Sequence, residues 1–208
     1  IDQMISPKEF CSKLWIYDRT LFPMKSLSGR WHVYKFFNEW TDVNEVKKQM
    51  KKIEKDLSRG YEVDTGHTLP TGWSDNSSGS WIYLPYSKDN VCYSPKGNPL
   101  EIDQFIYRHK HREHPLIAGA VGMQPFNGRH KALWNAALYM QYNSVDTTLE
   151  ELNSNLGKPI SKKELNNAEG VEEYSEEHLD NNLNNYLSEL CNDDIPFEKM
   201  LDETSSQM

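Results

Sequence analysis

The chain has 208 residues, of which 37% are hydrophobic. This is enough for one medium domain with an appendage or for two small domains. No apolar run approaches the roughly 20 residues of a membrane-spanning helix, and nothing near Ile1 resembles a signal peptide, so we expect a cytoplasmic protein without a membrane partner. Three widely spaced cysteines without a CxxC pair argue against a zinc ribbon and indicate reduced thiols.

The net charge of −8 is unevenly distributed. Residues 1–142 hold 19 Lys and Arg against 15 Asp and Glu, whereas residues 143–208 hold 4 against 16, which together give the 23 and 31 of the whole chain. The first part is therefore mildly basic, and the second part would repel phosphate. A cluster of lysines in the first part is interpreted most simply as a solvated helix face. Its members are Lys47, Lys48, Lys51, Lys52 and Lys55.

The first half of the chain predicts two helices and a β-hairpin. Ser6 can cap a helix whose first position is Pro7, and Asp42 can cap a second helix that ends near Gly60. Aromatic and β-branched residues predict a strand after the Ser-Gly turn, and Pro23 interrupts the strand before it. The expected elements are a helix over residues 6–17, strands over 21–26 and 31–37, a helix over 42–60, and brief strands over 61–64 and 81–84.

The second half of the chain predicts a helical region and an acidic tail. Helices are expected over residues 100–109, 128–142, 148–156 and 162–168. From Gly170 on, acidic and Asn-rich stretches predominate, and the last residues have the composition of a disordered segment. We therefore expect a mixed domain over residues 1–100, a helical connector over 101–168 and an acidic tail over 169–208.

The order of the elements predicts an α+β fold. If the residues before Ile1 form a strand, the order becomes strand, helix, strand, strand, helix, strand. This is the split βαβ arrangement of ferredoxin-like and RRM domains. An antiparallel sheet with both helices on one face would leave its other face open for a ligand. Because many unrelated proteins share this arrangement, the function has to be inferred from the residues of the site.

Residues that suit a triphosphate gather at the predicted hairpin. Two cations, a hydroxyl, backbone amides and an imidazole occur there within one turn. The second strand would place His32, Tyr34 and Phe36 on one face. The alternative is an ordinary hairpin with a core histidine, and this stretch alone does not decide between the two. The candidate residues are Lys25, Ser28, Gly29, Arg30 and His32.

Two carboxylates form a second candidate group. Glu62 and Asp64 would lie on the same face of a strand. Hard divalent cations such as Mg²⁺ bind to carboxylate oxygens together with substrate phosphates. The alternative is a solvent-facing acidic pair on an edge strand. The metal site gains weight because the predicted fold would place this pair on the sheet near His32.

Taken in order, several segments resemble the primase-polymerases of phages, plasmids and related mobile elements, in the archaeo-eukaryotic primase superfamily. The similar segments are residues 25–36 with the Ser-Gly turn and the histidine, residues 62–64 with the acids, residues 79–86 (Gly-Ser-Trp-Ile-Tyr-Leu-Pro-Tyr), and residues 125–139 in the helical region. The match covers roughly residues 1–165, by the order and spacing of short motifs.

The resemblance implies a DNA primase or polymerase domain that carries out template-directed nucleotidyl transfer in the replication of a mobile element. Lys25, Ser28 and His32 would contact the incoming nucleotide, and Glu62 or Asp64 would bind to Mg²⁺ or Mn²⁺. Two metal ions would activate a 3′-hydroxyl and stabilise the leaving pyrophosphate. The expected partners are nucleoside triphosphates, a single-stranded DNA template and a replicative helicase.

Two departures from the family pattern concern Arg30 and the first metal motif. The family usually has a small residue where this chain has Arg30, which could either clamp a phosphate or block the site. The first metal motif of the family is a pair of acids one residue apart, at the end of the first strand. Asp2 lies at about the right distance from Ser28 to be one of them, and its partner would precede Ile1. We therefore expect a truncated first strand.

Basic residues of the helical region are further candidates. His109, His111 and His114 lie near Tyr107, as in replication initiators that nick DNA with a tyrosine. Lys110 would place a cation beside such a metal, so a basic patch that contacts phosphate is the better interpretation. A catalytically inert nucleic-acid-binding module is the other alternative to the polymerase. The residues expected to contact DNA are Tyr34, Arg108, Lys110, Arg112, Arg129 and Lys131.

Overall fold

A computed structural model describes residues 1, 5–61, 63, 83–87 and 90–169. The three predicted acidic ligands, Asp2, Glu62 and Asp64, lie outside the described residues. Half of the residues of the predicted strands over 61–64 and 81–84, and the acidic tail from Gly170 on, also lie outside them. The described residues form a mixed α/β protein with a small antiparallel sheet and several helices.

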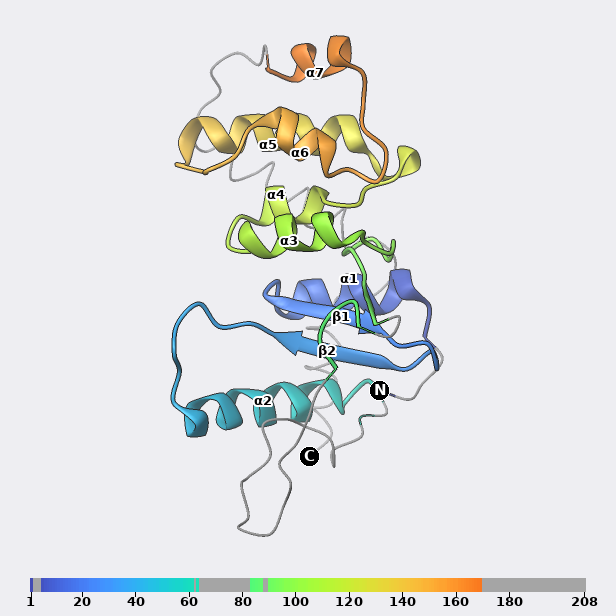
Figure 1. The fold of residues 1–208 in the computed structure, drawn as a ribbon, viewed down its shortest axis with the longest axis vertical. Helices are drawn as coiled ribbons and strands as arrows, with labels where there is room; N and C mark the ends of the chain where they lie inside the picture. Colours follow the sequence, from blue (N-terminus) through green and yellow to red (C-terminus); the bar gives the residue numbers. More distant parts are fainter. Residues whose placement is uncertain (2–4, 62, 64–82, 88–89, 170–208) are drawn as a thin grey trace, which may run out of the picture.

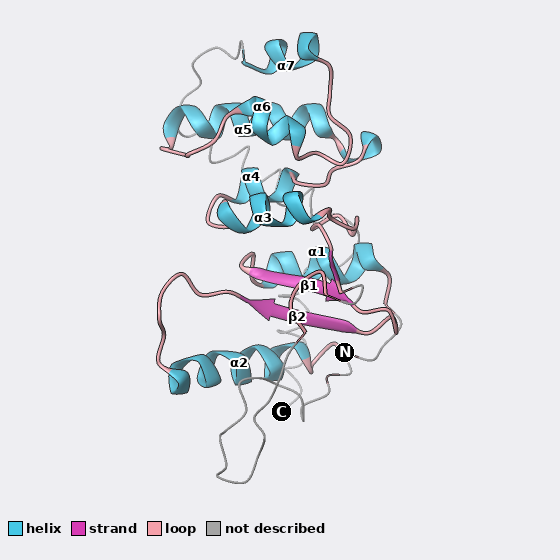
Figure 2. Ribbon diagram, viewed as in Figure 1, coloured by secondary structure: helices cyan, strands magenta, loops and turns pink. Residues whose placement is uncertain are grey.

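The elements are stacked along the long axis of the molecule (Figure 1). Helix α2 (Val43–Leu57) lies at one end and α7 (Lys162–Glu169) at the other. The strands lie between α2 and the remaining helical layers, so one half of the molecule is mixed and the other half is helical (Figure 2). Among the described residues, no helix is long and apolar enough to cross a membrane.

Helix α1 (Pro7–Tyr17) begins as the sequence predicts. The side chain of Ser6 accepts a hydrogen bond from the backbone nitrogen of Glu9 at 3.1 Å, and Pro7 occupies the first helical position, where its missing N–H costs nothing. Phe10 and Leu14 are buried. The cap and the apolar spacing therefore fix the start and the buried face of this helix.

Strands β1 (Leu21–Lys25) and β2 (Trp31–Lys35) form the predicted hairpin. Met24 lies opposite His32 in this ladder, and Lys25 lies opposite Trp31. Since opposite residues of an antiparallel pair share a face, the even-numbered residues of both strands lie on one face and the odd-numbered residues on the other.

A third strand, β3 (Val91–Cys92), pairs with β1 and makes the order β2-β1-β3. On the other side of the hairpin, Ile1 exchanges both backbone hydrogen bonds with Trp31, at 2.9 and 3.1 Å. The sheet is antiparallel as expected. The third strand is not the predicted one, because Tyr83 and Leu84 are irregular and the pairing segment begins at Val91.

The odd-numbered face of the hairpin is covered by α1 and α2. One hydrophobic cluster joins residues of α1, β1, β2 and α2, with the ring centroids of Phe10 and Trp31 4.8 Å apart. Across this layer the Tyr17 hydroxyl donates to the Asp56 carboxylate at 2.8 Å. Both helices therefore lie against the same face, as expected. The buried members of the cluster are Phe10, Cys11, Leu14, Leu21, Trp31, Ile53 and Leu57.

The even-numbered face is not open, which corrects our expectation. Phe22, Met24 and Tyr34 are buried in a second cluster that continues through the helical region as far as Ala168. Phe105 of α3 packs against Phe22 with the ring centroids 5.7 Å apart. Large apolar side chains on both faces of β1 demand cover on both faces. His32, at the end of this face near the turn, is half-exposed.

The helical region follows the prediction closely. The helices are α3 (Ile102–Lys110), α4 (Pro115–Ala120), the 3-10 turn η2 (Pro125–Asn127), α5 (Arg129–Tyr142), α6 (Leu149–Ser154) and α7. Of these, α4 and η2 were not predicted. Helix α4 is short and wholly apolar, and all its residues after the first are buried, so it carries no amphipathic period.

Candidate functional site

The β1–β2 turn holds the residues expected to bind a triphosphate. The Oγ atoms of Ser26 and Ser28 are 2.9 Å apart, and Ser26 Oγ also lies 3.3 Å from the Arg30 carbonyl oxygen. Gly29 has a φ of +83°, a value that favours glycine. Its backbone N–H donates to the Ser26 carbonyl at 2.8 Å. The amide of Gly29 is therefore used inside the turn, and the exposed hydroxyl of Ser28 is the better phosphate donor.

The two faces of the hairpin separate Lys25 from His32. Lys25 lies on the face of Trp31, with its Nζ 5.2 Å from the centroid of the indole ring. His32 lies on the face of Met24 and is half-exposed. The register therefore places Lys25 and His32 on opposite faces of the hairpin, whereas we expected them to converge on one ligand. Ser28, Gly29 and Arg30 are exposed at the turn between them.

Next to His32, on the same face of the sheet, lies a hydrogen-bonded polar group formed by Tyr34, Tyr83 and Asn90. The Tyr34 hydroxyl donates to the Tyr83 carbonyl at 2.8 Å and accepts from the side-chain amide of Asn90 at 3.0 Å. Asn90 is 3% exposed, and its Oδ1 has no hydrogen-bond partner in the part of the chain that the structure describes. A buried amide oxygen without a donor is costly, which makes Asn90 a candidate ligand contact that the sequence did not indicate.

Tyr86, between Tyr83 and Asn90 in the chain, carries backbone strain. Its φ is +61°, in a region that non-glycine residues rarely adopt. The hydroxyl donates to the Leu100 carbonyl at 2.9 Å, and the ring packs against Phe105. Burial raises the pKa of this phenol. These contacts hold the strained residue in place, and its backbone N–H donates to the Asn90 carbonyl at 2.9 Å.

The predicted metal ligands Asp2, Glu62 and Asp64 lie outside the described residues, so their arrangement around His32 stays a prediction. Among the residues that the structure describes, no group of three or more His, Cys, Asp or Glu side chains could hold a metal ion.

Three residues expected to contact DNA are buried. Arg108 and Arg112 are 1% and 7% exposed, and Tyr34 is 8% exposed and hydrogen-bonded. Arg112 donates to the His109 carbonyl at 2.6 Å. These positions do not agree with the predicted role, because a buried guanidinium offers no charge to a phosphate at the surface.

The remaining predicted DNA contacts lie at the surface of the helical region. Lys110 forms an ion pair with Asp146 at 3.0 Å. Arg129 donates to the carbonyls of Lys158 and Pro159. Lys131 is exposed on α5. Of the five basic residues predicted, only Lys110, Arg129 and Lys131 are therefore placed where a DNA strand could reach them.

Arg108 replaces a donor that the sheet lacks. Pro23 has no N–H, and on the side of β1 that faces β3 its carbonyl accepts from Tyr93 N at 3.0 Å. The return bond to the Tyr93 carbonyl comes from Arg108 Nη1 at 3.0 Å, and Arg108 Nη2 donates to the Leu21 carbonyl at 3.3 Å. The guanidinium therefore closes the β1 edge where the ladder stops.

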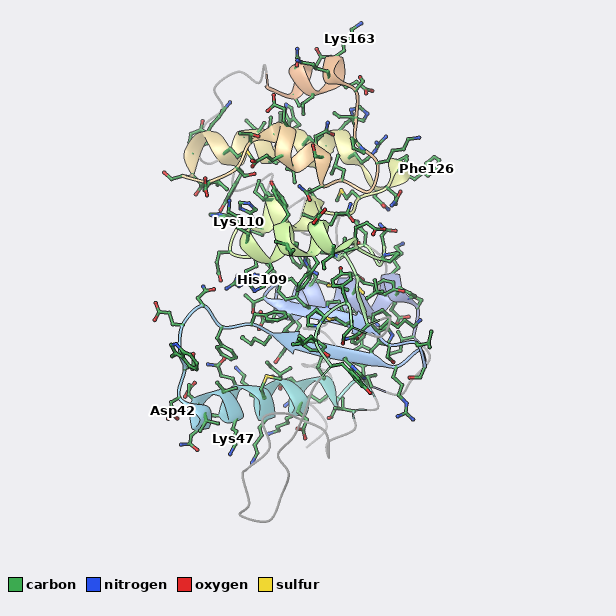
Figure 3. The ribbon with its side chains drawn as sticks, in the orientation of Figure 1. Asp42, Lys47, His109, Lys110, Phe126 and Lys163 are labelled. Atoms are coloured by element: carbon green, nitrogen blue, oxygen red, sulfur yellow. The ribbon has the colours of Figure 1, made fainter. Side chains whose placement is uncertain are left out.

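The histidine cluster does not converge on a single point. His109 lies between α3 and the strands (Figure 3), with its ring centroid 4.9 Å from that of Phe36. His111 is buried against the Tyr107 ring, and His114 lies with its Nδ1 3.2 Å from the Tyr139 hydroxyl. Burial lowers the pKa of His109 and of His111. These three side chains therefore pack with aromatic rings.

A pocket of about 340 Å³ lies away from the predicted site. It is formed where α1 ends and where the turn after α3 passes it, and it contains none of the predicted nucleotide or metal residues. Its lining includes Asp18, Arg19, Arg112 and Glu113. Asp18 is already engaged by Thr20 and Lys35, so the pocket has few unused charges.

Comparison with known proteins gives no match: no protein-family model fits the chain, and no curated protein or solved structure is significantly similar to it.

Proposed function

We propose that the chain is a DNA primase or polymerase domain that carries out template-directed, metal-dependent nucleotidyl transfer during replication of a phage, plasmid or other mobile element. The observation that carries the proposal is the β1–β2 hairpin. Its exposed Ser-Gly turn is followed at once by His32, on the half-exposed end of a sheet face. The same turn and histidine belong to the first of the segments that resemble primase-polymerases.

Each residue of the turn has a separate task in this proposal. The Ser28 hydroxyl and the Arg30 guanidinium would bind to phosphate oxygens at the exposed tip, since charge-assisted bonds to phosphate are among the strongest. The His32 imidazole would donate to the same triphosphate from β2. Asn90 would bind to the base or the sugar through its free Oδ1. The protein would thus contribute position and charge.

The predicted cation site consists of Asp2, Glu62 and Asp64. A bound Mg²⁺ or Mn²⁺ would supply charge neutralisation on the triphosphate and activation of the attacking hydroxyl. We expect both Glu62→Ala and Asp64→Ala to lower metal-dependent incorporation, and one of the two variants to lower it far more than the other. Calorimetric titration with Mn²⁺ measures binding directly. Equal Mn²⁺ binding by both variants and by the parent chain would show that these acids are not ligands.

The decisive experiment is template-directed incorporation of labelled nucleotides by the parent chain and by His32→Ala. We expect His32→Ala to lower incorporation at least about 100-fold, on the scale of a lost transition-state contact. The melting temperature should change by less than a few degrees, because His32 is only half-buried. A large fall in melting temperature would instead identify His32 as a core residue.

A catalytically inert nucleic-acid-binding module is the second candidate. It is favoured by the separation of Lys25 from His32 on the two faces of the hairpin, which leaves fewer groups to bind one triphosphate. Incorporation assays on a chain extended before Ile1 separate the two. Retained DNA binding without incorporation, in a folded chain, would support the module.

A nicking initiator has less support. The Tyr107 hydroxyl lies 2.7 Å from the Thr147 hydroxyl, and burial raises the pKa of Tyr107 to about 12. A nucleophilic tyrosine needs a neighbouring base or metal. The absence of a covalent Tyr107–DNA adduct would agree with this assessment.

A further inference from the structure

A continuous basic surface covers one side of α2. At 100° per residue, four lysines fall within about 100° of arc, opposite the buried Ile53 and Leu57. All four are exposed, and in the part of the chain that the structure describes they take part in no ion pair. We call this surface the α2 lysine face. It consists of Lys48, Lys51, Lys52 and Lys55.

Two of the three acidic residues of α2, Glu45 and Asp56, lie at one border of this face and have polar partners, and Glu54 lies at the opposite border. Glu45 accepts from Gln49 at 3.2 Å, and Asp56 is held by Tyr17 and by Arg59. Lys47 lies at the other border, and its side chain is directed away from the strands (Figure 3). Without an ion-pair partner among the described residues, these four cations over about 10 Å of helix repel one another, which costs stability.

An exposed aromatic side chain precedes the lysine face in the chain. Trp40, two residues before the cap Asp42, is completely exposed. An indole in full contact with water contributes nothing to the fold. Basic residues that follow a phosphate backbone, together with an aromatic ring on which bases stack, are the combination by which proteins bind to single-stranded nucleic acid.

We propose that the α2 lysine face and Trp40 bind to single-stranded DNA, with the lysines on the phosphates and Trp40 stacked on a base. This inference rests on the proposed function for the identity of the strand. A lipid surface fits less well, because an amphipathic helix binds to membranes through its apolar side, and the apolar side of α2 is buried against α1 and the sheet. A duplex fits less well, since its bases are already stacked.

The test is fluorescence anisotropy of a labelled 20-nucleotide oligothymidylate at several NaCl concentrations, without nucleotide and with a metal chelator. The variant is Lys48→Gln/Lys51→Gln/Lys52→Gln. We expect at least tenfold weaker binding near 50 mM NaCl. The slope of log affinity against log salt should become shallower by about 2, since single strands lose about 0.7 per phosphate contact. Replacement of the same three lysines by arginine should retain the affinity.

A matched control removes three charges at the other end of the molecule, in Lys158→Gln/Lys162→Gln/Lys163→Gln. All three lysines are exposed, Lys162 and Lys163 belong to α7, and Lys163 is labelled in Figure 3; we expect less than a twofold effect. Equal losses in both triple variants would mean that only net charge matters and would overturn the proposal. So would unchanged binding and slope in the α2 variant, with its fold verified by circular dichroism.

The stacking part of the proposal has its own test. Trp40→Ala should weaken oligothymidylate binding at least fivefold, on the scale of one lost base–aromatic stack, and Trp40→Phe should restore most of it. No effect of Trp40→Ala, or equally tight binding to a duplex, would overturn the single-strand assignment. Binding to phosphatidylserine vesicles that requires the α2 lysines, while oligonucleotide binding does not, would assign the face to a lipid surface.

These outcomes are independent of catalysis. Binding is measured without nucleotide or metal. If the parent chain is inactive but the α2 variant still binds the oligonucleotide more weakly than the parent, the polymerase proposal is contradicted and the DNA-binding surface is supported. An active chain with unchanged binding contradicts the DNA surface alone.

Discussion

At the scale of single residues, Arg108 is the most constrained side chain of the structure. It is completely buried, and its guanidinium carbon lies 4.5 Å from the centroid of the Phe22 ring and 5.2 Å from that of Trp15. Two backbone carbonyls accept from it, and no carboxylate pairs with it within the described part of the chain. Aromatic faces and carbonyl oxygens therefore take the place of an acid in stabilising the charge.

We predict that Arg108→Leu lowers the free energy of unfolding by about 3 kcal/mol or more, since two buried carbonyls each lose a donor at about 1–3 kcal/mol. Arg108→Lys should be intermediate, because an ammonium cannot reach both carbonyls in the planar geometry of a guanidinium. Urea denaturation measures both values.

Lys110→Gln provides the control for Arg108, on the same helix. Lys110 is exposed and pairs with an exposed Asp146, so its removal should change stability by no more than about 0.5 kcal/mol. If Arg108→Leu is as mild as Lys110→Gln, the guanidinium does not close the β1 edge.

The buried thiols predict a loss of stability in alkaline solution. Burial raises the pKa of Cys92 from 9.0 to about 11, although Arg108 nearby opposes this shift. Between these values the unfolded chain releases the proton and the folded chain keeps it, so the contribution is complete below pH 9 and falls as the pH rises. Burial also raises the pKa of Cys11, which acts in the same direction from pH 9 upward.

We therefore expect the free energy of unfolding to fall by about 1 kcal/mol per thiol between pH 9 and pH 10, because the unfolded thiol is already half ionised at pH 9. Urea midpoints at the two pH values measure the fall. The raised phenol pKa of Tyr86 adds to the fall, and Cys92→Ala should remove about half of the part that comes from the two thiols. A variant with the same pH dependence as the parent chain would contradict the assignment to Cys92.

At the scale of elements, Gly97 fixes the contact between the turn at residues 94–97 and the start of α1. A methyl group at Gly97 would overlap with the backbone nitrogen of Lys8, and the φ of Gly97 is +78°. Gly29 has a similar φ of +83° but open space around the missing methyl group. Substitution of Gly97 would therefore introduce both steric overlap and backbone strain, whereas substitution of Gly29 would introduce backbone strain alone.

Gly97→Ala should cost about 3 kcal/mol or more, from strain of about 1–2 kcal/mol plus overpacking of a similar size. Gly29→Ala should cost about 1–2 kcal/mol from strain alone. Thermal or urea denaturation of the two variants checks the difference. Equal costs would mean that α1 and the turn can move apart without penalty.

The elements also show what the sequence can predict. The caps Ser6 and Asp42, the turn around Gly29 and the apolar period of α5 are local signals, and each prediction from them is confirmed. The two-residue strand β3 has no such signal, because its pairing with β1 depends on contacts across about 70 residues. The burial of Arg108 depends in the same way on Pro23, whose missing N–H leaves a carbonyl of a distant segment without a donor.

The candidate site was predictable only in part, for the same reason. The register of the hairpin places His32 and Tyr34 on one face, as the strand period predicts. The same register places Lys25 on the other face, which the period could have indicated. The hydrogen-bond partners of the Tyr34 hydroxyl are Asn90 and Tyr83, which are more than 45 residues away in the sequence, and no sequence pattern near β2 predicts these contacts.

At the scale of the whole molecule, one hydrophobic cluster crosses the predicted boundary at residue 100. It contains Phe22 and Met24 of β1 together with Leu116 of α4 and Leu133 of α5. Arg108 adds polar bonds from α3 to the sheet across the same boundary. The sheet and the helices α3–α5 therefore share a core, although the amino-acid composition changes between them.

A shared core predicts a single cooperative unfolding transition for the sheet and the helical region. Trp15 and Trp31 are buried next to the sheet, so in a Trp134→Phe background, which removes the tryptophan of α5, fluorescence reports mainly the unfolding of the sheet, while the far-ultraviolet circular dichroism reports mainly the helices. In urea the two signals should give midpoints that coincide within error, as two-state unfolding requires. Arg108→Leu should lower both midpoints together, since Arg108 joins the two parts. Separate midpoints, or a fluorescence midpoint that falls while the helical signal stays, would mean that residues 1–100 and the helices fold as independent domains.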